Sequence, residues 1–227
     1  MEEKFVSAVR GVTNELSASS EVTGIVWFGS VQRGEGTPAS DLDFYVVTEG
    51  PEYWRVARRY QDVPVELFFN PPPQLRLRFA NADVVALRAF ATGTVLWDKD
   101  DTTAALAAEA KRLYDAGPQL SDSSVALWRW RLTSAAHDLE VMSPGTPEAT
   151  LSTALLITQA LEGYCIFNRM WTEKPSKMLA YVATHEQRVA DIINTLGVTR
   201  LAASSLVDMV LAQVGGRLEE YRSPSAV

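Results

Sequence analysis

Hydrophobic positions in the first half of the chain follow first a helical and then a strand spacing. Residues 2–18 carry apolar side chains at helical intervals, which predicts a helix that packs one face on a sheet. Three short apolar or β-branched runs predict buried strands: residues 25–28, 44–47 and 63–69. The remaining segments predict a helix over 51–60, a helix over 74–91, a short edge strand over 94–97 and an alanine-rich helix after Asp100.

The pattern changes after Gly117-Pro118, two residues that break helices. From Ser121 onward we find no convincing strand, only long helical patterns over residues 123–142, 146–171, 176–184, 186–196 and 201–221. The sequence therefore predicts an α/β (α+β) domain with a small mixed sheet over residues 1–117. A bundle of four or five helices is expected over residues 118–227, with a frayed tail from Ser223.

Composition, net charge and cysteine content limit the partners and the cellular location that we expect for this protein. A chain of 227 residues with 47% hydrophobic content can bury a packed core. The net charge of −7 argues against a nucleic-acid partner, and it suits a cationic small acceptor, although solubility explains it equally well. The single cysteine, Cys165, excludes an internal disulfide. With neither a signal-peptide pattern nor a membrane-spanning stretch, we expect a cytoplasmic protein without a membrane partner.

The segment 28–47 contains the candidate chemistry. Gly29 ends the first apolar run and allows a sharp turn, and Ser30 adds a hydroxyl and an N–H, a combination that suits a phosphate. Asp41 and Asp43 are two residues apart at the start of the next strand, so both carboxylates point to one face. Neighbouring carboxylates repel each other unless a cation lies between them, and Mg²⁺ bound to a nucleotide phosphate meets this need.

A third acid falls in the strand over 63–69. Glu66 is the only charge between apolar neighbours, and it is costly to bury without a partner. A metal site at the two aspartates would supply that partner.

Taken together, these motifs resemble the DNA polymerase β type nucleotidyltransferase superfamily. The residues that carry the resemblance, in the order of that family, are Gly29-Ser30, Arg33-Gly34, Ser40-Asp41-Leu42-Asp43 and Glu66. Within the superfamily the chain looks most like the small antibiotic nucleotidyltransferases with an added helical domain. The resemblance implies a nucleotidyltransferase domain over residues 1–117 and a helical substrate-binding domain over 118–227.

The resemblance also implies a mechanism. Asp41, Asp43 and Glu66 would bind Mg²⁺, while Gly29 and Ser30 hold the phosphates of ATP. Arg33 and Ser40 are further candidates for nucleotide binding. An acceptor hydroxyl would attack the α-phosphorus, with Glu66 as its base. In some relatives the base comes from the helical domain, which keeps Glu162 as a second candidate.

The helical half contributes two further candidates by resemblance. In the aminoglycoside adenylyltransferases a helix ending in arginine and tryptophan precedes a lysine that reaches the nucleotide; here Lys177, or failing it Lys174, would take that place. Glu162, or alternatively Glu140 or Asp138, would hold the ammonium groups of an acceptor. The competing interpretation is that these charges only solvate helix surfaces.

We therefore expect an enzyme that moves AMP from Mg-ATP to a hydroxyl of a small acceptor, such as an aminoglycoside antibiotic. Alternatives are an enzyme that AMPylates a protein and a non-catalytic regulatory or antitoxin-like module. Relatives often form dimers, and the sequence does not decide between a monomer and a homodimer.

Overall fold

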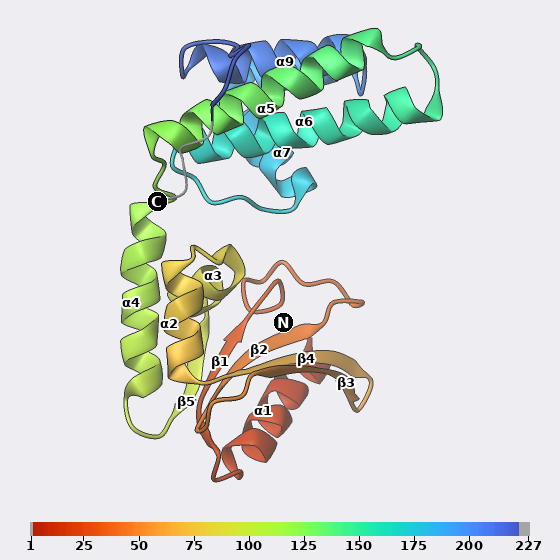
Figure 1. Ribbon diagram of the computed structural model, residues 1–227. Helices are drawn as coiled ribbons and strands as arrows, with labels where there is room; N and C mark the ends of the chain where they lie inside the picture. The colour runs from red at the N-terminus through yellow and green to blue at the C-terminus, as the bar shows by residue number, and fades with distance from the viewer. Residues whose placement is uncertain (1, 223–227) are drawn as a thin grey trace. The chain divides into compact units, whose positions relative to one another are not determined.

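The computed structural model describes residues 2–222, and the predicted tail from Ser223 lies outside them. The chain forms two compact units, residues 1–116 and residues 117–227. Each unit is described by itself below (Figure 1). None of the helices in residues 2–222 combines the length and apolar character needed to cross a membrane.

The first unit is a mixed sheet with helices on both faces. Its elements in chain order are α1 (Glu3–Ser17), β1 (Val22–Phe28), β2 (Leu42–Thr48), β3 (Trp54–Tyr60), β4 (Val63–Asn70), α2 (Pro72–Ala80), α3 (Val84–Thr92), β5 (Thr94–Asp98) and α4 (Thr102–Ala116). The strand order is β3-β4-β2-β1-β5. Strands β2 and β4 are parallel and the other neighbours are antiparallel, which confirms the predicted small mixed sheet and its edge strand.

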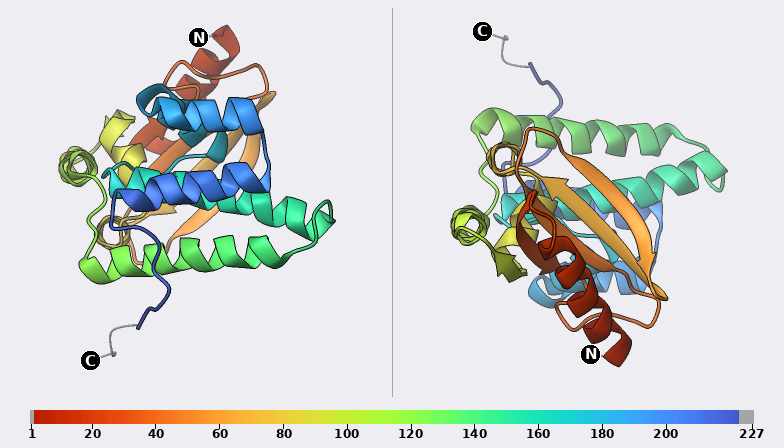
Figure 2. Two further views of the ribbon diagram at one scale, coloured as in Figure 1. Left: turned by 90° about the horizontal axis from the view of Figure 1, so that it is seen from above. Right: turned by 90° about the horizontal axis from the view of Figure 1, so that it is seen from below.

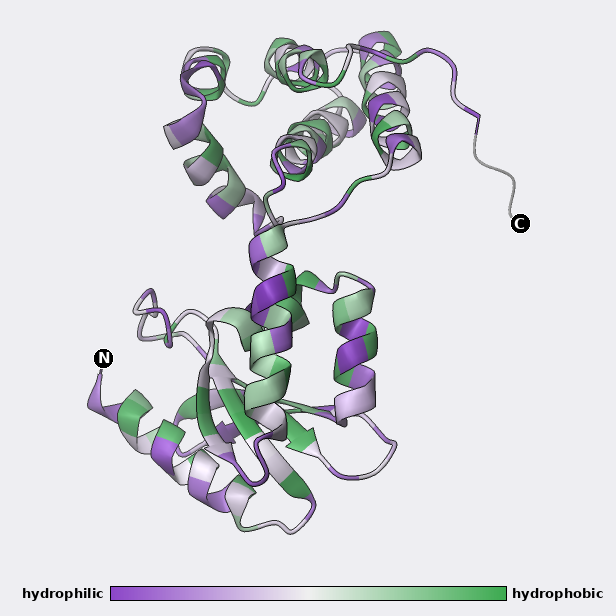
Figure 3. Ribbon diagram, turned by 90° about the vertical axis from the view of Figure 1, so that its left-hand side faces the viewer, coloured by the Kyte–Doolittle hydropathy of each residue, from purple (hydrophilic) through white to green (hydrophobic). Residues whose placement is uncertain are grey.

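Helix α1 covers one face of the sheet (Figure 2, right). Its side chains Phe5, Ala8, Val12 and Leu16 are buried at helical spacing, as the sequence pattern predicts. They pack on strand residues of alternating position, which include Ile25, Leu42, Phe44, Val46, Val65 and Leu67. Strands β1 and β2 are buried along most of their length and β3 carries three arginines, whereas α1 alternates between hydrophobic and hydrophilic residues (Figure 3).

The opposite face of the sheet carries both packing and polar groups. Tyr45 of β2 contacts the ring of Phe90 in α3 at 5.4 Å between centroids, so the α2–α4 layer lies on this face. Because successive strand residues alternate between faces, Asp43 points to the same side as Tyr45. The acidic residues therefore lie on the face away from α1.

Two helix predictions in this unit were wrong. Residues 54–60 form strand β3, which pairs with β4 through a turn at Gln61 (φ 51°). Arginine and alanine in this segment favour a helix by propensity, but pairing with β4 prevails. The predicted helix over 74–91 is two helices, because Ala82 adopts φ 55° and Asp83 then accepts bonds from the N–H groups of Val85 and Ala86 as the α3 N-cap.

The second unit is entirely helical within the described residues. Its helices are α5 (Asp122–Val141), α6 (Pro147–Phe167), α7 (Pro175–His185), α8 (Gln187–Leu196) and α9 (Arg200–Ala212). Helices α5, α6 and α9 pack against one another around a shared core that includes Leu132, Leu156, Ala160, Leu206 and Val210. The five helices confirm the predicted helical region.

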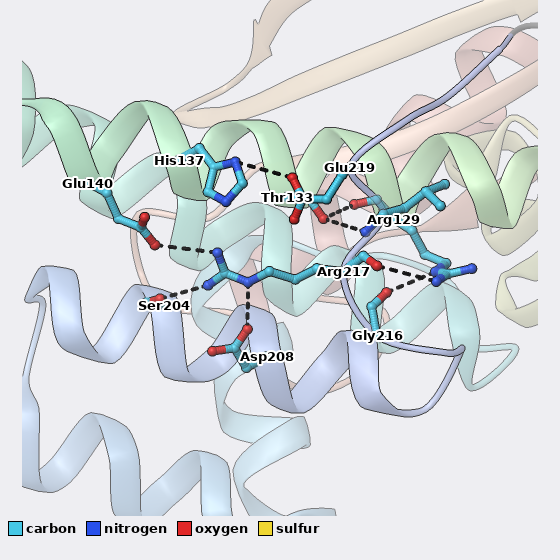
Figure 4. Close-up of polar contacts among 10 residues, drawn as sticks. Arg129, Thr133, His137, Glu140, Ser204, Asp208, Gly216, Arg217 and Glu219 are labelled. Atoms are coloured by element: carbon cyan, nitrogen blue, oxygen red, sulfur yellow. Dashed lines mark hydrogen bonds and ion pairs between the residues drawn. The ribbon is translucent and has the colours of Figure 1, made fainter.

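The last helix ends earlier than the pattern predicts. Helix α9 ends at Ala212 instead of continuing to Tyr221, because Gly215 and Gly216 adopt positive φ angles of 101° and 80°. The segment after α9 is held to the helices by two arginines, Arg129 of α5 and Arg217 of the segment itself (Figure 4). The Arg129 guanidinium donates to the carbonyl groups of Gly215 and Gly216 at 2.8 and 2.9 Å. Arg217 donates to Asp208, Glu140 and Ser204 at 2.8, 3.3 and 3.0 Å.

Replacing Arg217 by alanine is expected to destabilise the second unit. The change leaves two carboxylates without their guanidinium partner, and bonds to charged groups contribute about 1–3 kcal/mol before solvent screening. We expect a loss of about 1–2 kcal/mol in the free energy of unfolding, measured by urea denaturation. Arg188→Ala, at an exposed position of α8, is the matched control and should change stability little. Equal stability of the two variants would contradict a structural role for Arg217.

Candidate active site

Strand register brings three carboxylates together at one end of the sheet. In the parallel pairing of β2 with β4, Asp43 lies opposite Glu66. In the antiparallel pairing of β1 with β2, Asp43 lies opposite Phe28, the residue before Gly29. Asp41 precedes β2 by one residue and has the parity of Asp43. The sheet therefore places two segments that are more than twenty residues apart in one site.

The three carboxylates have the chemistry of a cation site. One oxygen from each of Asp41, Asp43 and Glu66 lies within 4.8 Å of the others, and all three residues are partly buried. Oxygen atoms this close repel each other unless a positive charge lies among them. Carboxylate oxygens are the ligands preferred by Mg²⁺, so the donor set fits a hard divalent cation.

Gly29 makes room for one of these acids. Its φ of 95° is unfavourable for other residues, and a Cβ at this position would lie 2.2 Å from Asp43 Oδ2. The carbonyl groups of Gly29 and Ser30 accept from the N–H groups of Arg33 and Glu35 at 3.3 and 2.9 Å, which closes a tight turn. The glycine is thus needed both for the turn and for the close approach of the carboxylate.

Glu66 has a cationic partner that the sequence interpretation missed. Arg55 Nη2 of β3 lies 2.5 Å from Glu66 Oε2. The Arg55 guanidinium also lies over the ring of Phe68, 5.0 Å from its centroid. Assigning residues 51–60 to a helix hid this contact, since only strand pairing with β4 brings Arg55 to the acid. Trp54, Val56 and Tyr60, which are aromatic or β-branched residues at alternating positions, were the available sequence signal of a strand.

Comparison with known proteins agrees with this geometry. Residues 9–83, which contain the glycine turn and all three acids, match the family model of the nucleotidyltransferase domain. The first unit contains a nucleotidyltransferase domain. A crystal structure of a nucleotidyltransferase-like protein from Exiguobacterium sibiricum 255-15 resembles the chain with a TM-score of 0.53 at 16% sequence identity. The match covers 92% of this chain and 76% of that one, and at this identity it shows a shared fold. Among curated proteins, none matches the chain in sequence.

Three predicted phosphate-binding residues lie in the loop that leads from β1 to β2 of the nucleotidyltransferase domain. Ser30 begins the turn after Gly29. The guanidinium of Arg33 forms an ion pair with Glu35 at 3.1 Å, so it already has an acidic neighbour. The Ser40 hydroxyl accepts from the Thr37 N–H at 2.8 Å and orders the approach to Asp41. Ser40 thus shapes the loop, and the roles of all three toward a nucleotide stay predictions.

The remaining candidates belong to the helical unit. Lys177 lies in the first turn of α7, and Lys174 is the residue before that helix. Glu162 lies in α6, where burial raises the pKa of its carboxyl and the nearby charge of Arg131 opposes the shift. Glu140 is bound to Arg217 at 3.3 Å, which occupies it in the structure of this unit. The contribution of these residues to a site in the nucleotidyltransferase domain stays a prediction.

Gly29→Ala is expected to disrupt the acid cluster without unfolding the domain. The new methyl group would displace the Asp43 carboxylate, and the positive φ adds about 1–3 kcal/mol of backbone strain. We expect affinity for Mn²⁺ alone, measured by isothermal titration, to fall roughly tenfold or more.

Gly34→Ala is the matched control for that change. Gly34 also has a positive φ, 76°, but no heavy atom would lie within 4 Å of its new Cβ. It should show the stability loss with unchanged Mn²⁺ affinity. If Gly29→Ala binds Mn²⁺ as tightly as Gly34→Ala does, Mn²⁺ binding does not depend on the position of Asp43 that Gly29 allows.

Glu162→Gln is expected to change the pH dependence of stability. Since the folded state raises the pKa of Glu162 above its ordinary 4.5, its stabilising effect is complete below about pH 4.5 and is lost as pH rises through the folded pKa. The variant should therefore gain stability relative to the original protein as the pH rises above about 4.5, measured by urea unfolding over a series of pH values. The exposed Glu220→Gln control should show no such trend, and parallel curves for all three proteins would refute the expectation.

Proposed function

We propose that the protein transfers a nucleoside monophosphate, AMP from ATP, to a hydroxyl group of a small acceptor. The observation that carries this proposal is the convergence of Asp41, Asp43 and Glu66 within 4.8 Å, beside the Gly29 turn, in a nucleotidyltransferase domain. The aminoglycosides are the acceptor class suggested by the resemblance of the sequence motifs. The choice of ATP as the donor rests on the same resemblance of the sequence motifs.

The three carboxylates would hold Mg²⁺. When bound, the ion would neutralise charge on the triphosphate as pyrophosphate leaves. The fit rests on the donor set and on the spacing of its oxygen atoms.

The chain's own groups would position the reactants. Backbone N–H groups near Gly29 and the Ser30 hydroxyl would bind the β- and γ-phosphates. The acceptor oxygen forms a bond to the α-phosphorus, and the bond from that phosphorus to the bridging oxygen breaks. Pyrophosphate leaves with the electron pair. The hydroxyl proton passes to a carboxylate, for which Glu66 is the first candidate and Glu162 the second.

Arg55 affects the assignment of Glu66 as a base. Arg55 Nη2 lies 2.5 Å from Glu66 Oε2, so this oxygen already has a charged donor, and the second carboxylate oxygen of Glu66 would bind the metal ion. An acceptor hydroxyl would have to compete with Arg55 for the Oε2 atom of Glu66. The structure thus supports Glu66 as a ligand more strongly than as the base.

Binding of ATP should require both a divalent ion and the two aspartates. Isothermal titration of ATP with Mg²⁺ is expected to give saturable binding that EDTA removes and that Asp41→Ala/Asp43→Ala loses by at least about tenfold, because charge neutralisation and positioning supply most of the interaction. Turnover should fall further, by roughly a thousandfold or more, measured as pyrophosphate release with an acceptor panel that includes kanamycin.

Asp62→Asn, at an exposed turn of the same domain, is the control for loss of negative charge. It should bind Mg-ATP as the original protein does. Metal-independent ATP binding that survives the double alanine change would reject the proposed site.

A further inference from the structure

In-line transfer defines where an acceptor must approach. The attacking oxygen enters opposite the leaving pyrophosphate. The Gly29 turn follows β1, and the carboxylates lie on β2 and β4, so the proposed phosphate site is on the β1 side of the acids. The sheet continues from β4 to β3 on the other side. The acceptor should therefore lie over β4 and β3.

A pocket of about 400 Å³ lies on that side, within the nucleotidyltransferase domain. Rings of Tyr45 and Phe68 line it, with centroids 5.2 Å apart and planes inclined by 27°. Tyr53, Arg55, Arg78 and Val85 are among its other lining residues. Its lining combines aromatic rings with charged and amide side chains, and its volume lies in the range of small-ligand sites.

The pocket begins two residues along the strands from the acid cluster, at the next side chains on the same face of the sheet. Phe68 follows Glu66 by two residues on β4, and Tyr45 follows Asp43 by two residues on β2, so all four side chains share one face. Two residues of strand span about 7 Å. A ring that packs against the edge of Phe68 would place its own hydroxyl beside the carboxylates. Arg55 contacts both Glu66 and the Phe68 ring, so it links the acid cluster to the pocket.

The charges of the lining disfavour a polycation. Arg78 is paired with Asp83 at 2.8 Å and donates to Asn70 at 3.2 Å, so the acid of the pocket already has a cation. Arg55 is likewise paired with Glu66. An ammonium-rich ligand would meet two guanidinium groups and no acid without a partner among the lining residues.

We propose that this pocket holds the acceptor, and that the acceptor is a planar hydroxylated aromatic compound rather than a polycationic sugar. The proposal rests on the proposed nucleotidyl transfer and narrows its substrate class. The acceptor ring packs on the edge of Phe68, since Tyr45 and the Arg55 guanidinium cover the faces of that ring. It lies between the side chains of Tyr53 and Val85 and directs its hydroxyl toward the acid cluster. That oxygen forms the new bond to the α-phosphorus, pyrophosphate departs with the bridging oxygen, and the proton passes to a carboxylate.

The test uses 2-naphthol as probe and full-length protein. Val85 is 51% exposed, so Val85→Trp should fill the pocket without disturbing the core, and Tyr53→Ala, at 57% exposure, removes one wall. Leu77→Trp, at a position of 53% exposure on α2 outside the pocket lining, is the matched control. Thermal unfolding of each variant checks the fold. Naphthol binding is measured by isothermal titration without nucleotide, and pyrophosphate release is then measured with Mg-ATP.

We expect 2-naphthol to bind and to stimulate pyrophosphate release. Val85→Trp should weaken binding at least tenfold, Tyr53→Ala should weaken it several-fold, and Leu77→Trp should leave it unchanged. Asp41→Ala/Asp43→Ala should keep naphthol binding while losing Mg-ATP. Kanamycin, the polycationic comparison, should bind no more weakly to Val85→Trp than to the original protein.

Different results would separate this inference from the proposed function. If Mg-ATP binds but 2-naphthol does not, or binds equally to folded Val85→Trp, the aromatic acceptor site is wrong and the proposed function stands. Weaker kanamycin binding in Val85→Trp would also overturn it. If naphthol binding is sensitive to Val85→Trp but no Mg-ATP binds, the pocket holds an aromatic ligand and the acceptor role fails together with the proposed function.

Discussion

Electrostatic repulsion among three carboxylates is the constraint on which the proposed site depends. Asp43 and Glu66 lie opposite each other because β2 and β4 run parallel in one register, and Asp41 joins them from the start of β2. A shift of either strand by one residue would turn its acid toward α1 and into the hydrophobic core. The same packing that buries Leu42, Phe44 and Leu67 therefore holds the acids together. A divalent cation offsets the repulsion that this arrangement creates.

The surroundings of the acids fit that requirement. The backbone at Gly29 comes so close to Asp43 that a side chain there would overlap the carboxylate. On the other side, the Arg55 guanidinium faces Glu66 and rests on Phe68. These two neighbours limit where the carboxylates can point. The glycine turn, which suits a phosphate, therefore lies on one side of the acids, and the aromatic pocket lies on the other.

The family resemblance and the lining of the pocket favour different classes of acceptor. Resemblance to antibiotic nucleotidyltransferases favours a polycationic acceptor, and the acidic net charge is compatible with one. The lining of the pocket is different, because its acid is bound by Arg78 and its floor is made of Tyr45 and Phe68. Net charge describes the whole surface, whereas acceptor choice depends on the few groups that line one pocket.

The sequence by itself determined the fold class, the glycine turn, and the shared face of Asp41 and Asp43, because these follow from local spacing and residue type. It also marked Glu66 as an acid that needs a partner. Tertiary structure decided that residues 54–60 form a strand, that Arg55 is one partner of Glu66, and that α9 ends at Ala212. Local propensity favoured a helix at β3, and only hydrogen bonding to β4, a contact between different segments of the chain, overrides it. The aromatic pocket has the same origin, since its walls come from β2, β3, β4 and the segment from α2 to α3.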